Sequence, residues 1–211
     1  MRVLTFLKFM RQILKSKPAD LEWIQAQGLL AVKLAQIFAL RSDILPVEKC
    51  RQLQQLYQHA ASIPPEDVFA NIDQRAPDGF MEAFEEIDEI PLAAASVGQV
   101  HRGRLKNGED VVVKIIKAQN GKNFRRDVNR MRRWLRIFLL FMPKLRKVGN
   151  PVALLNHVAD YTTRELDLRN EIKGAKELDE IKTMISRDFS MELLKFPKYY
   201  PELSNKDILV S

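Results

Sequence analysis

The chain has 211 residues, of which 46% are hydrophobic and 29% charged, which is enough apolar content for one or two globular domains. Its single cysteine, Cys50, excludes an internal disulfide and is compatible with a reducing compartment. No apolar run approaches the ~20 residues needed to span a bilayer, so we expect no transmembrane helix in this chain. The net charge of +7 requires either an anionic partner or a solvated basic surface.

Residues 1–62 have helical patterns and predict a helical extension, followed by a second domain over 63–211. The segment MRVLTFLKFMRQILK is amphipathic. Asp20 is expected to cap a helix that continues through Ala39, and Pro46 to open another helix that ends at about His59. Pro64-Pro65 then interrupts the helical pattern.

The middle of the chain predicts a small antiparallel sheet. A short helix is expected from Pro65 and a strand near 85–90. Asn107-Gly108 separates two runs of strand character, and this dipeptide favours a type I′ hairpin turn with two residues at positive φ. The second run, 111–116, is β-branched except for Lys114.

Lys114 is the unusual residue of this hairpin. Side chains alternate across a strand, so Lys114 shares a face with Val112 and Ile116, and both faces of the strand look partly buried. A buried ammonium group is costly without an anion, so we expect a carboxylate or phosphate partner. An edge-strand lysine that extends to water is the alternative.

A loop of small residues precedes the hairpin, at the place where a kinase-like lobe has the glycine-rich loop that covers nucleotide phosphates. Small side chains allow main-chain N–H groups to approach phosphate oxygens closely. Gly98 is its only glycine, so the G-x-G-x-x-G form is absent, and a tight loop packed on a core is the alternative.

Two long helices are predicted after Gly121, at about 123–141 and 151–186, the second capped by Asn150 with Pro151 at its first position. The last segment, FPKYYPELSNKDILVS, predicts two short strands. The histidines stand apart in the sequence, and we expect structural roles for them.

Basic residues concentrate at the N-terminus and again over 125–136 and 144–147, where the last two clusters flank the apolar run WLRIFLLFMP. This pattern is compatible with a membrane-surface patch that attracts anionic lipids, or with an ordinary helix that has a solvated basic face. Nucleic acid is not an expected partner, because no binding motif or aromatic platform accompanies the charge.

Three stretches together carry a family resemblance. PLAAASVGQVHRGRLKNGEDVVVKI resembles the alanine-rich loop and lysine strand of the UbiB/ADCK family of atypical kinase-like proteins. KLAQIFALRSDILP is similar to the K-x-G-Q segment of that family, with Ala35 in place of glycine, and ELDLRNE is similar to its E-x-D segment. Their order and spacing agree with the family from about Gly28 onward.

The resemblance implies an α+β fold: a protein-kinase-like N-terminal lobe with a small antiparallel sheet and a long helix, preceded by the helical extension, with the C-terminal lobe absent. It also implies ATP as a ligand, with Mg²⁺ held mainly by the lobe that is absent and no metal site in this chain. The implied ATP-binding residues are Ala93, Ala94, Ala95, Ser96, Val97, Gly98, Gln99, Val100 and Lys114.

By the same resemblance, Glu171 is assigned to Lys114, and Glu165 and Asp167 are assigned to the segment that contains Lys33 and Gln36. On one continuous helix, Asp167 and Glu171 would form an i, i+4 pair of like charges, which different cations should neutralise. We expect the 20–39 helix to pack across the nucleotide side of the lobe, with Lys33 at Glu165 or Asp167. Solvated charges without function are the alternative.

The implied function is the N-terminal part of an atypical kinase or ATPase that supports ubiquinone or related isoprenoid-quinone biosynthesis. Catalysis is not expected to be complete in this chain. The implied location is cytoplasmic or peripheral to the inner membrane, and partners would include an anionic membrane surface, an isoprenoid lipid or quinone-biosynthesis proteins. The alternative function is a noncatalytic interaction module or one that binds lipid at a membrane surface.

Overall fold

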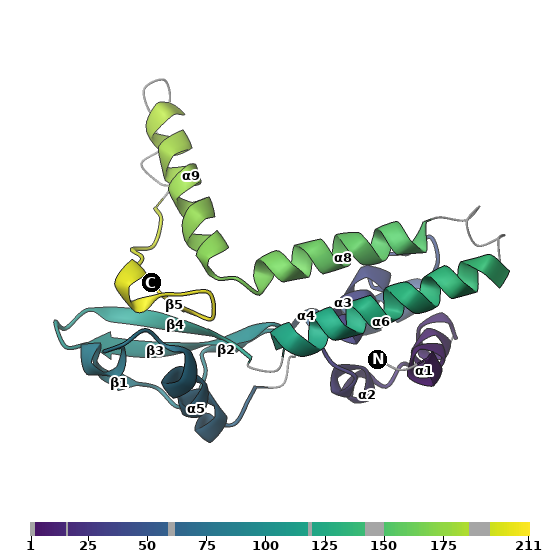
Figure 1. The fold of residues 1–211 in the computed structure, drawn as a ribbon, viewed down its shortest axis with the longest axis horizontal. Helices are drawn as coiled ribbons and strands as arrows, with labels where there is room; N and C mark the ends of the chain where they lie inside the picture. The colour runs from purple at the N-terminus through teal and green to yellow at the C-terminus, as the bar shows by residue number, and fades with distance from the viewer. Residues whose placement is uncertain (1–2, 16, 59–61, 118–119, 142–149, 186–194) are drawn as a thin grey trace. The chain divides into compact units, whose positions relative to one another are not determined.

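The structure is a computed structural model that describes residues 3–15, 17–58, 62–117, 120–141, 150–185 and 195–211 (Figure 1). The chain divides into two compact units. We call Met1–Ser62, Ala94–Val97 and Ala118–Thr163 the helical unit, and Ile63–Ala93, Gly98–Lys117 and Arg164–Ser211 the sheet unit. The first boundary coincides with the one expected after residue 62, whereas 94–97 and 118–163 group with the helical unit.

The helical unit is built around α3, which contacts α1, α2, α4 and α6. Seven of the ten residues of α3 are buried, since its sequence LLAVKLAQIF is apolar on most sides. In the described part of the chain, no helix is both long and apolar enough to cross a membrane. The helices of this unit are α1 Val3–Leu14, α2 Leu21–Ala26, α3 Leu29–Phe38, α4 Val47–Gln58, α6 Asn120–Phe141 and α8 Pro151–Glu165.

The single helix predicted over 20–39 is wrong, because the structure has two helices there, α2 and α3. Asp20 does act as the N-cap, because its carboxylate accepts the Trp23 N–H at 2.9 Å. The helix then ends and a new one begins at Gly28, whose φ of +92° is accessible to glycine and unfavourable for other residues. The predicted end of α4 near His59 lies outside the described residues, as does the basic cluster at 144–147.

The sheet unit contains an antiparallel sheet in the order β1-β3-β4-β5, with β2 paired to β3. This confirms the expected α+β fold with a small antiparallel sheet. Of the two strands expected at the C-terminal end, one is present, and a short 3₁₀ helix, Pro201–Leu203, precedes it. The elements of the unit are α5 Pro65–Arg75, the 3₁₀ helix Met81–Ala83, β1 Phe84–Ile87, β3 Gly98–Leu105, β4 Asp110–Ile116, α9 Arg169–Ile185 and β5 Ile208–Val210, and the short strand β2 Ala93–Ala94 has its first residue in this unit and its second in the helical unit.

The predicted hairpin joins β3 and β4, but its turn is not type I′. Gly108 has φ of +86°, while Asn107 does not have a positive φ. Gly108 N–H donates to Leu105 O at 2.8 Å, and Leu105 N–H donates to Glu109 O at 2.9 Å. These bonds describe a three-residue loop with one left-handed glycine. The Asn107 side chain accepts the Glu109 N–H at 3.0 Å, which stabilises the turn with one positive φ instead of two.

The core of the sheet unit lies on one face of the sheet. Val111, Val113 and Ile115 alternate along β4 and point to this face, where α5 covers them. The other core members come from α5, from the segment that leads into β1, and from the C-terminal strand: Val68, Ile72, Phe80, Phe84, Leu105, Tyr200, Ile208 and Val210. Lys114 belongs to the opposite face of β4.

The single helix predicted over 151–186 is wrong, because it is interrupted between α8 and α9. The Asn170 side chain caps the end of α8 by donating to Arg164 O at 3.0 Å. Asp167 accepts the Arg169 N–H at 3.2 Å at the start of α9. Leu168 between them is buried, and its N–H donates to Lys206 O at 3.0 Å. Local caps and one tertiary contact together end the first helix and begin the next.

Candidate nucleotide site

The hairpin positions Lys114 beside the end of the alanine-rich segment. Val100 pairs directly with Lys114 in the β3–β4 ladder, so the two side chains share the sheet face opposite the core. Val112 and Lys114 are half-buried on this face, and Ile116 is buried. About a third of the Lys114 side-chain surface (33%) is exposed. The ammonium group is therefore held at the sheet surface and is accessible to an anion.

Lys114 forms an ion pair with Glu171 in the first turn of α9. The two residues are 57 positions apart in the chain, and the anchored Leu168 sets the start of α9 next to the sheet. The predicted carboxylate partner of Lys114 is thus confirmed. Tyr199 lies near this pair and was not predicted from the sequence. Burial, and secondarily the negative charge of Glu171, raises the pKa of Tyr199.

At Gly98, in the small-residue segment, even a Cβ atom is sterically excluded. A Cβ there would lie well inside van der Waals contact of the Ile115 carbonyl oxygen and 3.2 Å from the carbonyl carbon. The close approach of β3 to β4 at this point therefore requires glycine. Leu92 N–H donates to Val100 O at 2.8 Å, which brings the chain before the loop back alongside β3.

The candidate ATP-binding residues divide between the two units. Ala93, Gly98, Gln99, Val100 and Lys114 belong to the sheet unit and lie on adjacent strands. The remaining four, Ala94, Ala95, Ser96 and Val97, belong to the helical unit. Their contact with a nucleotide stays a prediction.

Gln99 has its side chain in the protein interior. Its Oε1 accepts the Ile63 N–H at 2.9 Å, and its Nε2 donates to His101 Nε2 at 2.8 Å. His101 is fully buried, and its Nδ1 is 2.7 Å from Asp88 O. These partners assign the proton of a neutral His101 to Nδ1. His101 is therefore structural, as expected, and Gln99 could offer a nucleotide its main chain only.

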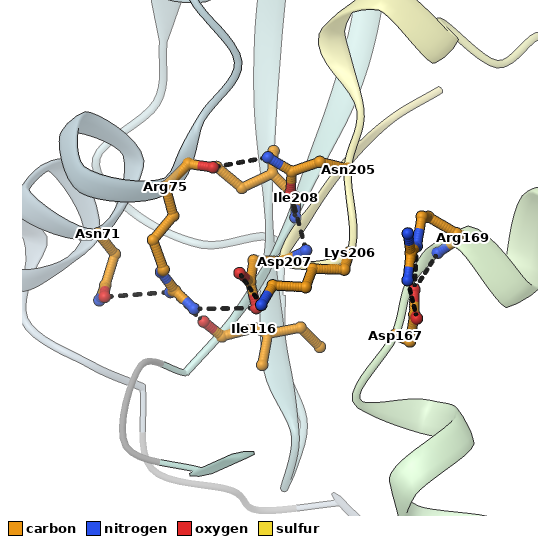
Figure 2. A network of polar contacts seen from close by, with 9 residues as sticks. All are labelled: Asn71, Arg75, Ile116, Asp167, Arg169, Asn205, Lys206, Asp207 and Ile208. Atoms are coloured by element: carbon orange, nitrogen blue, oxygen red, sulfur yellow. Dashed lines mark hydrogen bonds and ion pairs between the residues drawn. The ribbon is translucent and has the colours of Figure 1, made fainter. Parts of the chain in front are cut away.

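Asp167 has a cationic partner that we did not predict. Arg169, two residues later, donates through Nε and Nη2 to the two carboxylate oxygens at 2.8 and 2.6 Å (Figure 2). This bidentate hydrogen bonding lowers the pKa of Asp167. The expected i, i+4 pairing of Asp167 with Glu171 on one helix is wrong, because Asp167 precedes α9.

Gln36 and Lys33 both have partners within the helical unit. The buried Gln36 donates through its side-chain Nε2 to Leu56 O at 2.9 Å. Its main-chain carbonyl oxygen accepts a hydrogen bond from the Tyr57 hydroxyl at 2.9 Å. The Lys33 ammonium lies 5.9 Å from the centre of the Tyr161 ring. Ala35 is fully buried in α3. Since Lys33 and the acidic segment belong to different units, the predicted contact with Glu165 or Asp167 stays a prediction.

A second polar network was not predicted from the sequence. The Arg75 guanidinium, from the end of α5, donates to Asn71 Oδ1 at 3.0 Å and Ile116 O at 2.5 Å, and lies 3.4 Å from Asp207 (Figure 2). Asn205 donates to Arg75 O at 2.6 Å. Burial lowers the pKa of Arg75, and Asp207 opposes this effect. The network joins α5, the end of β4 and the start of β5. The Asn71–Arg75 spacing of four was its only sequence signal.

Within the described ranges, no group of three or more His, Cys, Asp or Glu side chains is arranged to hold a metal ion. The chemistry that the sheet unit offers is a partly exposed ammonium group, oriented by one carboxylate, beside a strand whose glycine keeps the backbone close. A cation of this kind binds phosphate or carboxylate oxygens.

Comparison with known proteins agrees with these features. Residues 55–211 match the family described as the ABC1 atypical kinase-like domain. Curated relatives named "Probable protein kinase UbiB" include those of Azotobacter vinelandii, 31% identical over 191 residues, and Vibrio vulnificus, 30% identical over 190 residues. Each alignment covers 89% of this chain and 34% of the relative, so the chain spans about a third of their length.

A solved structure supports the fold. The Mycobacterium tuberculosis protein Rv3197, determined in complex with erythromycin, superposes with a TM-score of 0.53 at 19% identity. The match covers 83% of this chain and 42% of that protein. On the family match and the motifs described above, the chain belongs to the ABC1 family of atypical kinase-like proteins, which is the UbiB/ADCK family.

Proposed function

We propose that the sheet unit forms the ATP-binding lobe of a UbiB-type atypical kinase or ATPase. The observation that supports this best is the ion pair between Lys114 and Glu171, which joins the lysine strand to the helix after it. A kinase-like lobe needs such a pair to orient the lysine toward nucleotide phosphates. The name of the relatives, probable protein kinase UbiB, supports the same class of activity.

The residues of the sheet unit fit a nucleotide. An ammonium group has three N–H donors, so one can bind Glu171 while the others bind phosphate oxygens at the exposed side. Glycine at position 98 keeps the β3 backbone free of a side chain beside this cation. Bound ATP would supply the phosphoryl group. Lys114 would orient its phosphates, and Glu171 would hold Lys114. Among the described residues we assign no magnesium ligand.

The biological role that we propose is support of ubiquinone or related isoprenoid-quinone biosynthesis, at the periphery of a membrane. The UbiB name of the relatives is the basis for this role. An isoprenoid lipid or quinone-biosynthesis proteins would then be its partners.

Replacing Lys114 by methionine tests the nucleotide site. Methionine keeps the length of the side chain and removes its charge and donors, so ATP affinity should fall about 10- to 100-fold, the value of one charge-assisted hydrogen bond. Titration with a fluorescent ATP analogue measures the affinity. Circular dichroism of both proteins establishes that the variant is folded.

Lys106→Met is the matched control, because Lys106 is an exposed lysine at the turn of the same hairpin. It removes the same charge and should leave ATP affinity unchanged. Equal ATP binding by the Lys114 and Lys106 variants, both folded, would contradict the assignment of Lys114.

The alanine-rich loop can be tested separately by nuclear magnetic resonance. On titration with ATP, the amide signals of residues 93–99 should move, because small side chains allow these N–H groups to approach phosphates. Signals of the distant Asn107-Gly108 turn should stay in place and serve as the internal reference. If ATP binds while the signals of 93–99 do not move, the loop has been assigned the wrong role.

A further inference from the structure

One exposed face of α6 combines arginines with apolar side chains. Arg130, Arg133, Ile137 and Leu140 are spaced as neighbours along one face of the helix, and Trp134 lies beside them. Leu140 is 73% exposed, and Ile137 and Trp134 are also exposed. The opposite face of α6, which includes Phe124, Val128 and Met131, is buried. The helix therefore has a second apolar stripe, which the described residues of the helical unit leave exposed.

Helix α1 has a similar exposed face. Leu4 is 80% exposed, and Leu7 and Leu14 are exposed as well, although Phe9 and Ile13 of the same helix are buried. Lys8 and Arg11 are also on its surface, and the helix sequence VLTFLKFMRQIL contains no acidic residue. Exposed leucines among cations, without acids, are typical of helices that lie in a membrane interface.

The two helices meet at a groove of about 420 Å³, formed by Val3 of α1 and by four residues of α6, namely Arg130, Arg133, Trp134 and Ile137. We call these five residues, together with Leu4 and Leu140, the basic–apolar face. Two guanidinium groups here border a tryptophan, an isoleucine and a valine. Lipid headgroups with adjoining acyl chains offer the complementary arrangement of negative charge beside hydrocarbon.

The charged residues of α6 are almost all basic. The helix contains six arginines and Lys122 against a single acid, Asp127. Asp127 is mostly buried and lies 4.0 Å from Arg130, at the limit of an ion pair, so most of the positive charge is not balanced within the helix. An excess of arginine next to exposed tryptophan and leucine favours an anionic membrane over an aqueous surface.

We propose that the basic–apolar face binds the surface of an anionic lipid bilayer. Arg130 and Arg133 attract the negative headgroups, while Trp134, Ile137, Leu140 and Leu4 enter the headgroup region beside them. This inference gives the proposed membrane location a specific surface. It does not depend on nucleotide binding, because every residue of the face belongs to the helical unit.

The first experiment is vesicle flotation with the 211-residue chain. It should float with phosphatidylcholine vesicles that contain phosphatidylglycerol, remain unbound with pure phosphatidylcholine, and dissociate as salt is raised. The double variant Arg130→Gln, Arg133→Gln should bind the anionic vesicles about 30-fold more weakly, the loss expected for two surface cations.

Lys173→Gln, Lys176→Gln is the matched control. These two exposed lysines have the same spacing of three on α9 of the sheet unit, next to acidic residues. The control removes the same net charge and should bind anionic vesicles like the unchanged chain. Equal weakening in both double variants would overturn the proposal, since it would show attraction by net charge alone. Equal flotation with pure phosphatidylcholine would also overturn it.

Tryptophan fluorescence locates the contact. The chain has two tryptophans, so Trp23→Phe leaves Trp134 as the only reporter, and Trp134→Phe leaves Trp23. Anionic vesicles with brominated acyl chains should quench and blue-shift Trp134 and leave Trp23 unchanged. Quenching of Trp23 alone would place the membrane contact elsewhere.

Nucleic acid is the competing polyanion, and the same variants test it. If single-stranded RNA binds the chain more tightly than anionic vesicles do, and if Arg130→Gln, Arg133→Gln abolishes that binding, the face recognises nucleic acid and the membrane proposal is wrong. ATP binding measured in parallel should be unaffected by these substitutions. A loss of vesicle binding is thus distinguishable from a failure of the nucleotide site.

Discussion

Replacing Gly98 by alanine is expected to destabilise the sheet unit by about 3 kcal/mol, because the added methyl group meets a rigid backbone. The Cβ would overlap the carbonyl oxygen of Ile115 in the neighbouring strand. Relief requires β3 and β4 to separate, and their ladder runs from the Gly98–Ile116 pair to the Arg104–Asp110 pair. Urea denaturation would measure the loss, and hydrogen exchange would show faster exchange of the β3 and β4 amides.

Gly174→Ala is the control for this prediction, with an expected effect of opposite sign. Gly174 lies inside α9, and a Cβ there would meet no atom within 4 Å. Alanine is favoured over glycine in a helix by about 0.5–1 kcal/mol, so this variant should be slightly more stable. If Gly98→Ala unfolds at the same urea concentration as the unchanged chain, the close approach of the two strands does not require glycine at this position.

The second large effect is expected from Asp207→Ala, which should lower the free energy of unfolding by about 2 kcal/mol. Arg75 and Asp207 are each only 19% exposed, so removal of the carboxylate leaves a guanidinium poorly solvated. Arg75 keeps its bonds to Asn71 and Ile116 O, which limits the loss. Urea denaturation of Asp207→Ala, Arg75→Met and the double variant would give a coupling energy of about 1–2 kcal/mol.

Asp110→Ala is the matched control, since Asp110 pairs with Arg104 on the exposed surface of the same sheet. An exposed pair contributes little, so this change should cost about 0.5 kcal/mol or less. Additive effects of the Arg75 and Asp207 substitutions would mean that these two side chains do not interact, and that the hydrogen bond from Asn205 to Arg75 O alone joins α5 to the C-terminal segment in this network.

Several features of the fold could be predicted from short sequence signals. Asp20 caps its helix, Pro65 opens α5, and the Asn-Gly dipeptide connects two strands. Each signal acts through the backbone of a few adjacent residues, so it needs no knowledge of the rest of the chain. The turn type was predicted incorrectly, because the Asn107 side chain satisfies the Glu109 N–H and one positive φ is then sufficient.

One part of the candidate site could be predicted, because Lys114 is a charged residue in an otherwise apolar strand. A lysine in a β-branched strand implies an anion nearby, and Glu171 provides it. The unpredicted parts are the break between α8 and α9, and the partner of Asp167. The helical pattern of the sequence continues through residues 166–168. It does not show that the Asn170 and Asp167 side chains form hydrogen bonds with the main chain, which end one helix and begin the next.

The sequence alone therefore accounts for most of the helices and strands, the Asp20 cap and the charged position in β4, because these depend on interactions between residues a few positions apart. The Arg75 network and the placement of α9 depend on contacts between distant segments: Asn205 and Arg75 are 130 residues apart, and Lys114 and Glu171 are 57 apart. Such pairs carry no local signal, since many other polar residues could have been brought to the same place. They become identifiable when burial of Leu168 and of the β4 core face brings the segments together.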